Sequence, residues 1–145
     1  MSLRLSLLGP ALVATLIASV MAEPSKSPES DIRPCPDRPN CVSSRAPEGP
    51  RKMDPIQYQG SAEDARRRIL EIMRTFPRAT ITQNSGNYLK VEFRSAIFSF
   101  VDDVEFEFDD AAKLIHFRSA SRLGYYDFGV NRRRMKKIIQ EFAGK

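Results

Sequence analysis

The chain has 145 residues, of which 41% are hydrophobic and 28% are charged, and its formal net charge at pH 7 is +5. This is one domain's worth of sequence, which rules out a multidomain machine, a polytopic membrane protein and a collagen-like fibre. Nine phenylalanines and four tyrosines supply material for a core, so the chain is not wholly disordered. No motif in the sequence names a reaction.

Residues 1–22 have the composition of a secretory signal. Arg4 precedes an apolar stretch, residues 5–21, and Val20 and Ala22 fit the −3 and −1 positions of a cleavage site. This pattern predicts cleavage after Ala22 and export to the periplasm or the extracellular space. The alternative is that residues 5–21 remain as a membrane anchor, although their length is at the short limit for a span.

Residues 23–55 contain eight prolines and no aromatic residue. Such a stretch builds little core and no long helix, so we expect a flexible tether over 23–33 and an ordered loop over 34–55. Cys35 and Cys41 are the only cysteines. In an exported chain we expect them to form a disulfide, which for a loop of about seven residues is worth roughly 2.4 kcal/mol in the chain-entropy model.

Residues 56–145 carry the predicted core, and their first element is a helix over 61–75. Ser61 is a good N-cap, and Pro77 ends the helix. The apolar stripe of this helix, with spacings of three and four, consists of Ala62, Ala65, Ile69, Ile72 or Met73, and Phe76.

Four strands are predicted next. A short β-rich stretch at 78–84 precedes a turn signal, residues 84–87. Three patterns of period two then follow, with the apolar positions Leu89, Val91 and Phe93; Phe98, Phe100, Val104, Phe106 and Phe108; and Ile115 and Phe117. A single apolar face predicts an antiparallel sheet with the helices packed on that face.

The last predicted helix covers roughly 128–143. Its cap is either Asn131 or Asp127, and we favour Asp127, which turns the amide of Asn131 inward. The predicted fold is therefore α+β with two layers, in which a four-stranded, mostly antiparallel sheet is covered by two helices in the order α-β-β-β-β-α. With the disulfide-stapled loop, it forms a single domain over 34–145.

The charges of this region are polarised. Residues 118–137 carry seven basic residues against one acid, and the strand before them is acidic. Asp102 falls on the apolar parity of that strand, so either a bulge turns it outward or it is buried and paired. We expect Asp102 or Asp103 to pair with Arg118 or Arg122.

Residues 118–129 join a strand end to a helix start through two glycines. Helix N-terminal amides, arginines and hydroxyls can together bind a carboxylate, phosphate or sulfate, although such loops also use these residues only to satisfy the backbone. The candidate ligand-binding residues are Asp102, Asp103, Arg118, Ser119, Ser121, Arg122, Tyr125, Asp127, Asn131, Arg132 and Arg134.

Four stretches of the sequence form a distinctive set: Cys35 to Ser44, Phe100 to Phe106, Arg118 to Arg122, and Gly124 to Arg134. Together they resemble an uncharacterised bacterial and plastid-associated family, the domain of unknown function 1499. The chain departs from the family at Tyr126, where members often have a serine. The resemblance implies an extracytoplasmic or membrane-associated setting and adds no catalytic assignment.

Two classes of function follow from these residues. The first is a non-catalytic envelope domain that binds an anionic ligand or partner through Arg118, Arg122 and the start of the last helix. The alternative is a small hydrolase or isomerase in which Asp102 or Asp103 is the base and the arginines hold an anionic substrate. In a third reading, the polar residues only support the fold.

The expected partners are an anionic small molecule or an anionic membrane surface, which suit a basic face. Nucleic acid is not expected, because export separates the protein from cytosolic nucleic acid and no nucleic-acid-binding module appears. No cofactor or metal is expected, because the two cysteines are assigned to a disulfide and His116 is the only histidine. The sequence leaves the oligomeric state open.

Overall fold

The computed structural model describes residues 31–144 of the chain. The expected signal, residues 1–22, and most of the expected tether lie outside the described residues. In chain order the elements are β1 (Cys41–Ser43), β2 (Ile56–Gln57), α1 (Ala62–Thr75), β3 (Ala79–Ser85), β4 (Tyr88–Arg94), β5 (Val101–Asp109), β6 (Leu114–Ser121) and α2 (Val130–Ala143).

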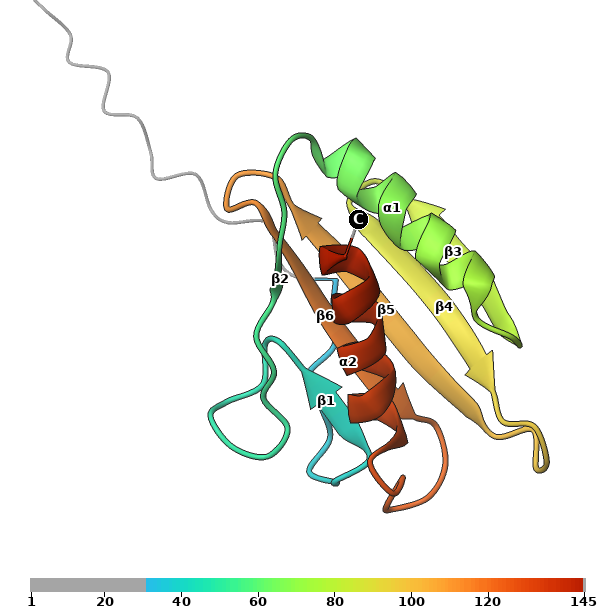
Figure 1. The fold of residues 1–145 in the computed structure, drawn as a ribbon. Helices are drawn as coiled ribbons and strands as arrows, with labels where there is room; N and C mark the ends of the chain where they lie inside the picture. The colour runs from blue at the N-terminus through green and yellow to red at the C-terminus, as the bar shows by residue number, and fades with distance from the viewer. Residues whose placement is uncertain (1–30, 145) are drawn as a thin grey trace, which may run out of the picture.

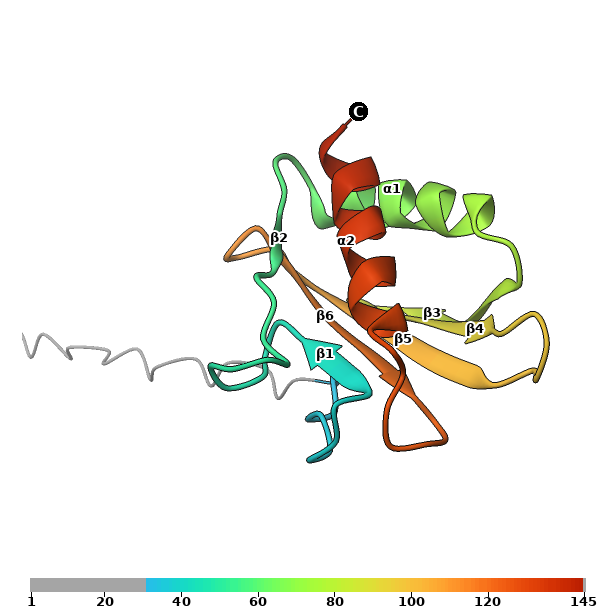
Figure 2. The same cartoon turned by 60° about the horizontal axis from the view of Figure 1, so that its bottom comes forward.

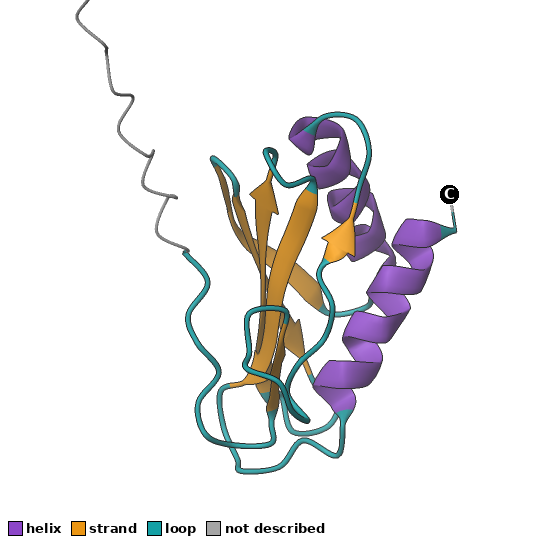
Figure 3. Ribbon diagram, turned by 90° about the vertical axis from the view of Figure 1, so that its left-hand side faces the viewer, coloured by secondary structure: helices purple, strands orange, loops and turns teal. Residues whose placement is uncertain are grey.

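The strands form one sheet in the order β1-β6-β5-β4-β3, and β2 also pairs with β6. All of these strand pairs are antiparallel. Both helices lie on one face of the sheet (Figures 1 and 2). The segment before β1 runs along the opposite face, as the view from the side shows (Figure 3), and the backbone N–H of Asp31 donates to Glu107 there. The two-layer α+β fold with a mostly antiparallel sheet is therefore confirmed. We call the two sides of the sheet the helix face and the open face.

The predicted number of four strands is wrong, because the sheet has six. The two additional strands, β1 and β2, come from the stretch around the expected loop and place two short strands ahead of α1. They are three and two residues long, too short for a period to be visible in the sequence. Their pairing with β6 joins residues more than 50 positions apart, such as Cys41 and Ala120. Ile32, which falls within the expected tether, is buried.

Helix α1 matches its prediction. The hydroxyl of Ser61 accepts a hydrogen bond from the backbone N–H of Asp64, which is the geometry of an N-cap. The residues that α1 turns toward the sheet and buries are Ala65, Ile69, Ile72 and Met73. They pack in one core with residues of the sheet and of α2, including Leu89, Val91, Phe106, Phe117 and Met135.

The start of β5 differs from the prediction. The period of two suggested that Phe98 and Phe100 continue the strand, but β5 begins at Val101 and both rings are exposed. Ser99 has a φ of 52°, which breaks the extended conformation between them. A hydrogen bond from the backbone N–H of Ser95 to the carbonyl of Phe100 closes the loop instead.

Helix α2 begins at Val130, two residues later than predicted. The carboxylate of Asp127 accepts hydrogen bonds from the backbone N–H groups of Gly129 and Asn131, at 2.9 and 2.8 Å. Asp127 thus has the capping role that we favoured, although Gly129 is the residue next to the helix. Asn131 is fully buried, as that choice requires.

Candidate functional site

The predicted site residues fall into two groups on opposite faces of the sheet. Strand β5 pairs with both of its neighbours without a register shift, so no bulge intervenes at Asp102 and Asp103. Alternation along a strand then places Asp102 on the helix face and Asp103 on the open face. The same alternation in β6 separates Ser119 from Arg118.

On the helix face, Asp102 is paired with Arg134 of α2. One Nη of Arg134 donates to the Asp102 carboxylate at 2.5 Å, and the other donates to Asn131 Oδ1 at 2.7 Å and to Ser119 Oγ at 3.2 Å. The guanidinium also lies over the ring of Phe93, 4.5 Å from its centre. Asp102, on the apolar parity of its strand, is therefore turned inward and paired, with 15% of its side chain exposed.

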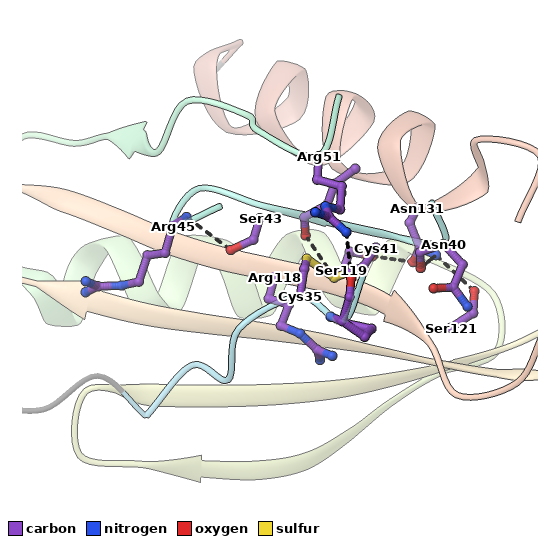
Figure 4. Close-up of a disulfide and its surroundings, with 12 residues drawn as sticks. Cys35, Asn40, Cys41, Ser43, Arg45, Arg51, Arg118, Ser119, Ser121 and Asn131 are labelled. Carbon is purple, nitrogen blue, oxygen red and sulfur yellow. Dashed lines mark hydrogen bonds between the residues drawn. A yellow bond between two sulfur atoms is a disulfide. The ribbon is translucent and has the colours of Figure 1, made fainter. Parts of the chain in front are cut away.

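The side chain of Asn131 completes this group. Its Nδ2 lies within 3.1 Å of the Asn40 carbonyl, Ser121 Oγ and the Asp127 carboxylate, and its Oδ1 accepts from the hydroxyl of Ser119 at 2.6 Å. Figure 4 shows Asn131 directed from α2 toward Asn40 and Ser121. Because both polar atoms of the Asn131 side chain have protein partners, this group of contacts serves the fold.

The N-terminus of α2 is also satisfied from within the chain. Asp127 accepts the backbone N–H groups that an external anion would need. Arg132 donates to the carbonyls of Pro50 and Lys52, which ties α2 to the loop before β2. Tyr125 is exposed in the loop that leads to the helix. The predicted combination of helix amides and arginines is thus not assembled at this helix start.

On the open face, Asp103 is held by two cations. Arg122 Nε and Nη2 donate to its two oxygens at 2.9 and 2.8 Å, and Lys90 Nζ lies 3.2 Å away. Arg122 also pairs with Glu92 of β4. The expected pairing of a β5 acid with an arginine after β6 is confirmed for Asp103 and Arg122.

Arg118 is the most buried cation of the open face. Its Nη1 donates to Glu105 Oε2 at 2.8 Å, and the hydroxyl of Tyr88 donates to the other oxygen of Glu105 at 2.7 Å. The side chain of Arg118 is only 10% exposed. Its Nε is buried and has no hydrogen-bond partner among the described residues. A buried, unsatisfied guanidinium N–H costs stability unless another group accepts from it.

Lys90, Asp103, Arg118 and Arg122 line a pocket of about 450 Å³ on the open face, which we call the open-face pocket. One wall comes from the segment before β1, which the Cys35–Cys41 disulfide closes into a loop and which Arg51 holds through Asp37. Figure 4 shows Arg118 beside this disulfide. The charged residues of the pocket are the five cations Arg33, Arg38, Lys90, Arg118 and Arg122 and the single acid Asp103.

The electrostatics of the pocket keep Asp103 ionised. Burial alone would raise its pKa, but the hydrogen bonds from Arg122 and Lys90 outweigh that effect, and the pKa lies below its usual value. The hydrogen bonds of Arg122 to Asp103 and, to a smaller extent, to Glu92 raise the pKa of Arg122. A carboxylate whose pKa is lowered is a weak general base at neutral pH. Asp102, the other proposed base, lies on the opposite face of the sheet from this pocket.

His116 lies on the open face away from the pocket. Its Nδ1 is 3.4 Å from the hydroxyl of Ser44, and burial, followed by the charge of Arg45, lowers its pKa. Over residues 31–144, no group of three or more His, Cys, Asp or Glu side chains is arranged to bind a metal ion. The helices of the same part of the chain are all too short or too polar to cross a membrane.

Sequence reasoning missed three cations of the pocket: Arg33, Arg38 and Lys90. Lys90 could have been found from the pairing of the strands. In the register of the sheet, Lys90 of β4 lies opposite Glu105 of β5, and Glu105 lies opposite Arg118 of β6. Charges of alternating sign across three strands indicate a polar face. Arg33 and Arg38 precede the sheet, and no local pattern predicts that they lie against it.

A larger pocket of about 850 Å³ lies between β2 and the two helices. Beside this pocket, the hydroxyl of Tyr58 donates to Asp110 at 3.0 Å, and the guanidinium of Arg68 lies 4.7 Å from the ring centre of Phe142. Burial and the bond to Asp110 raise the pKa of Tyr58 to about 12, so its hydroxyl stays protonated. This pocket contains fewer cations than the open-face pocket and is a weaker candidate for binding an anion.

Comparison with known proteins gives a family and no function. No curated protein matches the chain. The model of the family described as "Protein of unknown function (DUF1499)" matches residues 31–142. This range contains the whole sheet, the disulfide and the open-face pocket, and it covers most of the chain. The protein therefore belongs to the DUF1499 family.

Proposed function

We propose that this protein is an exported, non-catalytic domain that binds a small anion in the open-face pocket. The expected ligand carries carboxylate, phosphate or sulfate groups. The pocket volume of about 450 Å³ lies within the usual range for small-molecule sites, roughly 300–1,000 Å³. A ligand of this size can lie on the sheet between β4 and the loop that contains the disulfide.

The observation that carries the proposal is the state of Arg118. Its side chain is nine-tenths buried, yet its Nε donates to no described residue. Guanidinium groups bind oxyanions through two parallel N–H donors, and one such donor is unused here. An oxyanion in the open-face pocket provides the missing acceptor.

The charge around the pocket also favours an anion. The internal ion pairs use the carboxylates of Glu92, Asp103 and Glu105. Five cations line the pocket, so an excess of positive charge remains after these pairs. Part of this excess is on Arg38, which is exposed at the rim and can turn toward a ligand.

Two features support the proposal that the protein is exported. Residues 1–22 have the pattern of a secretory signal, and the only two cysteines of the chain form a disulfide, a bond that persists in oxidising compartments. We expect the mature protein recovered from cells to begin at Glu23. Mass spectrometry of that protein tests this, and an intact N-terminus would contradict it.

The binding proposal is tested by thermal unfolding and calorimetry with inorganic phosphate, sulfate and citrate, at constant ionic strength with chloride as the reference anion. We expect at least one of these anions to raise the Tm in a saturable way, because a ligand that binds only the folded state stabilises it. Arg38→Glu should weaken that effect at least tenfold, since it reverses an exposed charge at the pocket. Arg67→Glu, which reverses an exposed charge on α1, is the matched control and should leave the affinity unchanged.

Two outcomes would overturn the proposal. One is that none of the three anions shifts the Tm beyond the effect of chloride. The other is that Arg38→Glu and Arg67→Glu weaken binding equally, which would show that the anion responds to overall charge and has no site at the open-face pocket.

A further inference from the structure

Two loops of the protein each present a pair of aromatic rings to solvent. In the loop at 95–100, the rings of Phe98 and Phe100 stack 5.5 Å apart. In the loop at 122–129, the rings of Tyr126 and Phe128 meet edge to face at 5.1 Å. In each pair one residue separates the two aromatics. The contacts hold the rings against each other without burying either one.

Both loops leave the sheet at the same end of its strands. The first follows Arg94, which is paired with Val101 at the start of β5, and the second follows Ser121, which is paired with Asp102. The backbone N–H of Arg122 also donates to the carbonyl of Val101. Because β4 and β6 lie on either side of β5, the loops start about 10 Å apart. Figures 1 and 2 show both loops extending from this end of the molecule.

The side chains at these loop tips are unusually exposed for their type. Exposures range from 53% to 82% for the group Ile97, Phe98, Phe100, Leu123, Tyr125, Tyr126 and Phe128. Single exposed apolar residues are common, but a cluster at one end of a domain indicates a surface that meets another apolar phase. Phe128 has a φ of 54°, a conformation that a bulky residue rarely adopts, and it still directs its ring outward.

Cations surround these apolar tips. Arg78 and Arg94 lie at the base of the first loop, where Arg78 Nε donates to the carbonyl of Arg94. The side chain of Arg94 is 53% exposed, although one Nη lies 3.4 Å from the carboxylate of Glu92. Arg133 lies at the base of the second loop and donates to the carbonyl of Phe128. The one acid of this loop, Asp127, is engaged in capping α2. This end of the sheet therefore combines exposed apolar loop tips with positively charged side chains at the loop bases.

We propose that these two loops dock the protein on an anionic lipid bilayer, with the aromatic tips in the interfacial layer and Arg78, Arg94 and Arg133 at the headgroups. Aromatic side chains favour this layer, and basic residues near it are attracted by anionic lipids. Two separate convex tips suit a soft surface, which can close around both, better than a folded protein, which would need a matching groove for each. This role goes beyond anion binding, because none of the seven apolar side chains lines the open-face pocket.

The absence of tryptophan from the chain provides a local test. Phe98→Trp and Phe128→Trp each place a single fluorophore at one tip, and Ala111→Trp places one in the exposed turn between β5 and β6 as a control. The full chain of each variant is mixed with vesicles of equimolar phosphatidylglycerol and phosphatidylcholine. We expect a blue shift of emission, and quenching by brominated lipid, for the two tip variants and not for Ala111→Trp. Residues 5–21 are common to all three chains, so a difference between them reports on the loops.

The electrostatic part of the proposal is tested in the Phe98→Trp background. Arg94→Gln and Arg133→Gln should each weaken partitioning to the anionic vesicles about fivefold. Arg67→Gln on α1 removes the same charge away from the loops and should leave partitioning unchanged. Vesicles of phosphatidylcholine alone should bind all of these chains equally.

Three results would overturn this inference. The first is no emission shift at either tip. The second is an equal emission shift at the tips and in the control turn, which would mean that the protein adsorbs without a preferred orientation. The third is a shift that depends on protein concentration and needs no vesicles, which would mean that the tips bind a second copy of the chain.

Discussion

The two faces of the sheet are buried by different means, although the same strands contribute to both. On the helix face, β5 presents Val104, Phe106 and Phe108 to α1 and α2 in an apolar core. On the open face, it presents Asp103 and Glu105, which are buried as ion pairs. Polar residues on the helix face form contacts that serve the fold, whereas those on the open face border a pocket with an unsatisfied donor.

This comparison explains why net charge is a poor guide to the partners of this protein. The acidic strand and the basic residues after it meet inside the fold, where most of their charges cancel. What remains for a ligand is set by side chains outside the pairs, such as Arg38. The position of an unmatched charge thus says more about binding than the total does.

The helix face should be the main source of stability. Phe106→Ala removes a fully buried ring from its centre and should lower the free energy of unfolding by about 3–5 kcal/mol. Phe98→Ala, at an exposed tip, should change it by less than about 0.5 kcal/mol. Urea denaturation of both variants measures the difference, and similar losses would contradict the assignment of the core.

The open face should tolerate the loss of a whole ion pair better than the loss of half of one. Arg118→Met leaves the buried Glu105 with the Tyr88 hydroxyl and, at 3.9 Å, Arg33 Nε, and should cost about 3 kcal/mol, the lower end for breaking a buried pair. The double variant Arg118→Met/Glu105→Gln should recover most of that loss. A double-mutant cycle by denaturation measures the coupling, and additive losses would show that the pair is not coupled.

The disulfide should stabilise the open face specifically. Reduction by dithiothreitol should lower the free energy of unfolding by roughly 2.4 kcal/mol in the chain-entropy model, because a seven-residue loop is released in the unfolded chain. The double variant Cys35→Ala/Cys41→Ala controls for other effects of the reductant and should not respond to it. Hydrogen exchange should show the largest loss of protection in β1 and the pocket wall, whereas Phe106 and its neighbours should lose only the protection that the lower free energy of unfolding removes everywhere. Uniform loss over both faces would argue against a local role.

The smallest expected effect is a difference in acid sensitivity. The pKa of Asp103 is lowered in the folded state, so its contribution to stability is present above its usual pKa of 3.8 and is lost as the pH falls through the folded value. Asp103→Asn should therefore flatten the decline of stability below about pH 4. Asp64→Asn is a matched control on α1, because the pKa of Asp64 is also lowered but its side chain is exposed. Equal slopes for the wild type and Asp103→Asn would contradict the role given to this pair.

Local sequence patterns predicted those elements whose signals are local. Ser61 and the stripe of α1 follow from spacings within one helix, and the alternation in β4, β5 and β6 follows from burial of one face. The strands β1 and β2 were missed, because each is defined by pairing with a distant part of β6. The start of β5 was placed too early, because a period of two continued by chance through Phe98 and Phe100.

The candidate site was predicted in its residue types and not in its arrangement. Asp103 and Arg122 were expected to pair, and they do. Asp102 and Asp103 are adjacent in sequence and were treated as equivalents, although strand alternation sends them to opposite faces. Arg33 and Arg38 could not be found, because only the folded path of the N-terminal segment brings them to the sheet.

The disulfide has a thermodynamic consequence for the site that it borders. Cys35 and Cys41 close the loop that forms one wall of the open-face pocket, so the oxidised chain holds that wall in place before any ligand arrives. Coupling between two events is reciprocal. An anion that binds the closed wall more tightly than the open one must therefore make the bond harder to reduce. Anion binding in the pocket then protects the disulfide, and the disulfide in turn favours anion binding. A chain in a reducing compartment would lack the disulfide and this mutual stabilisation.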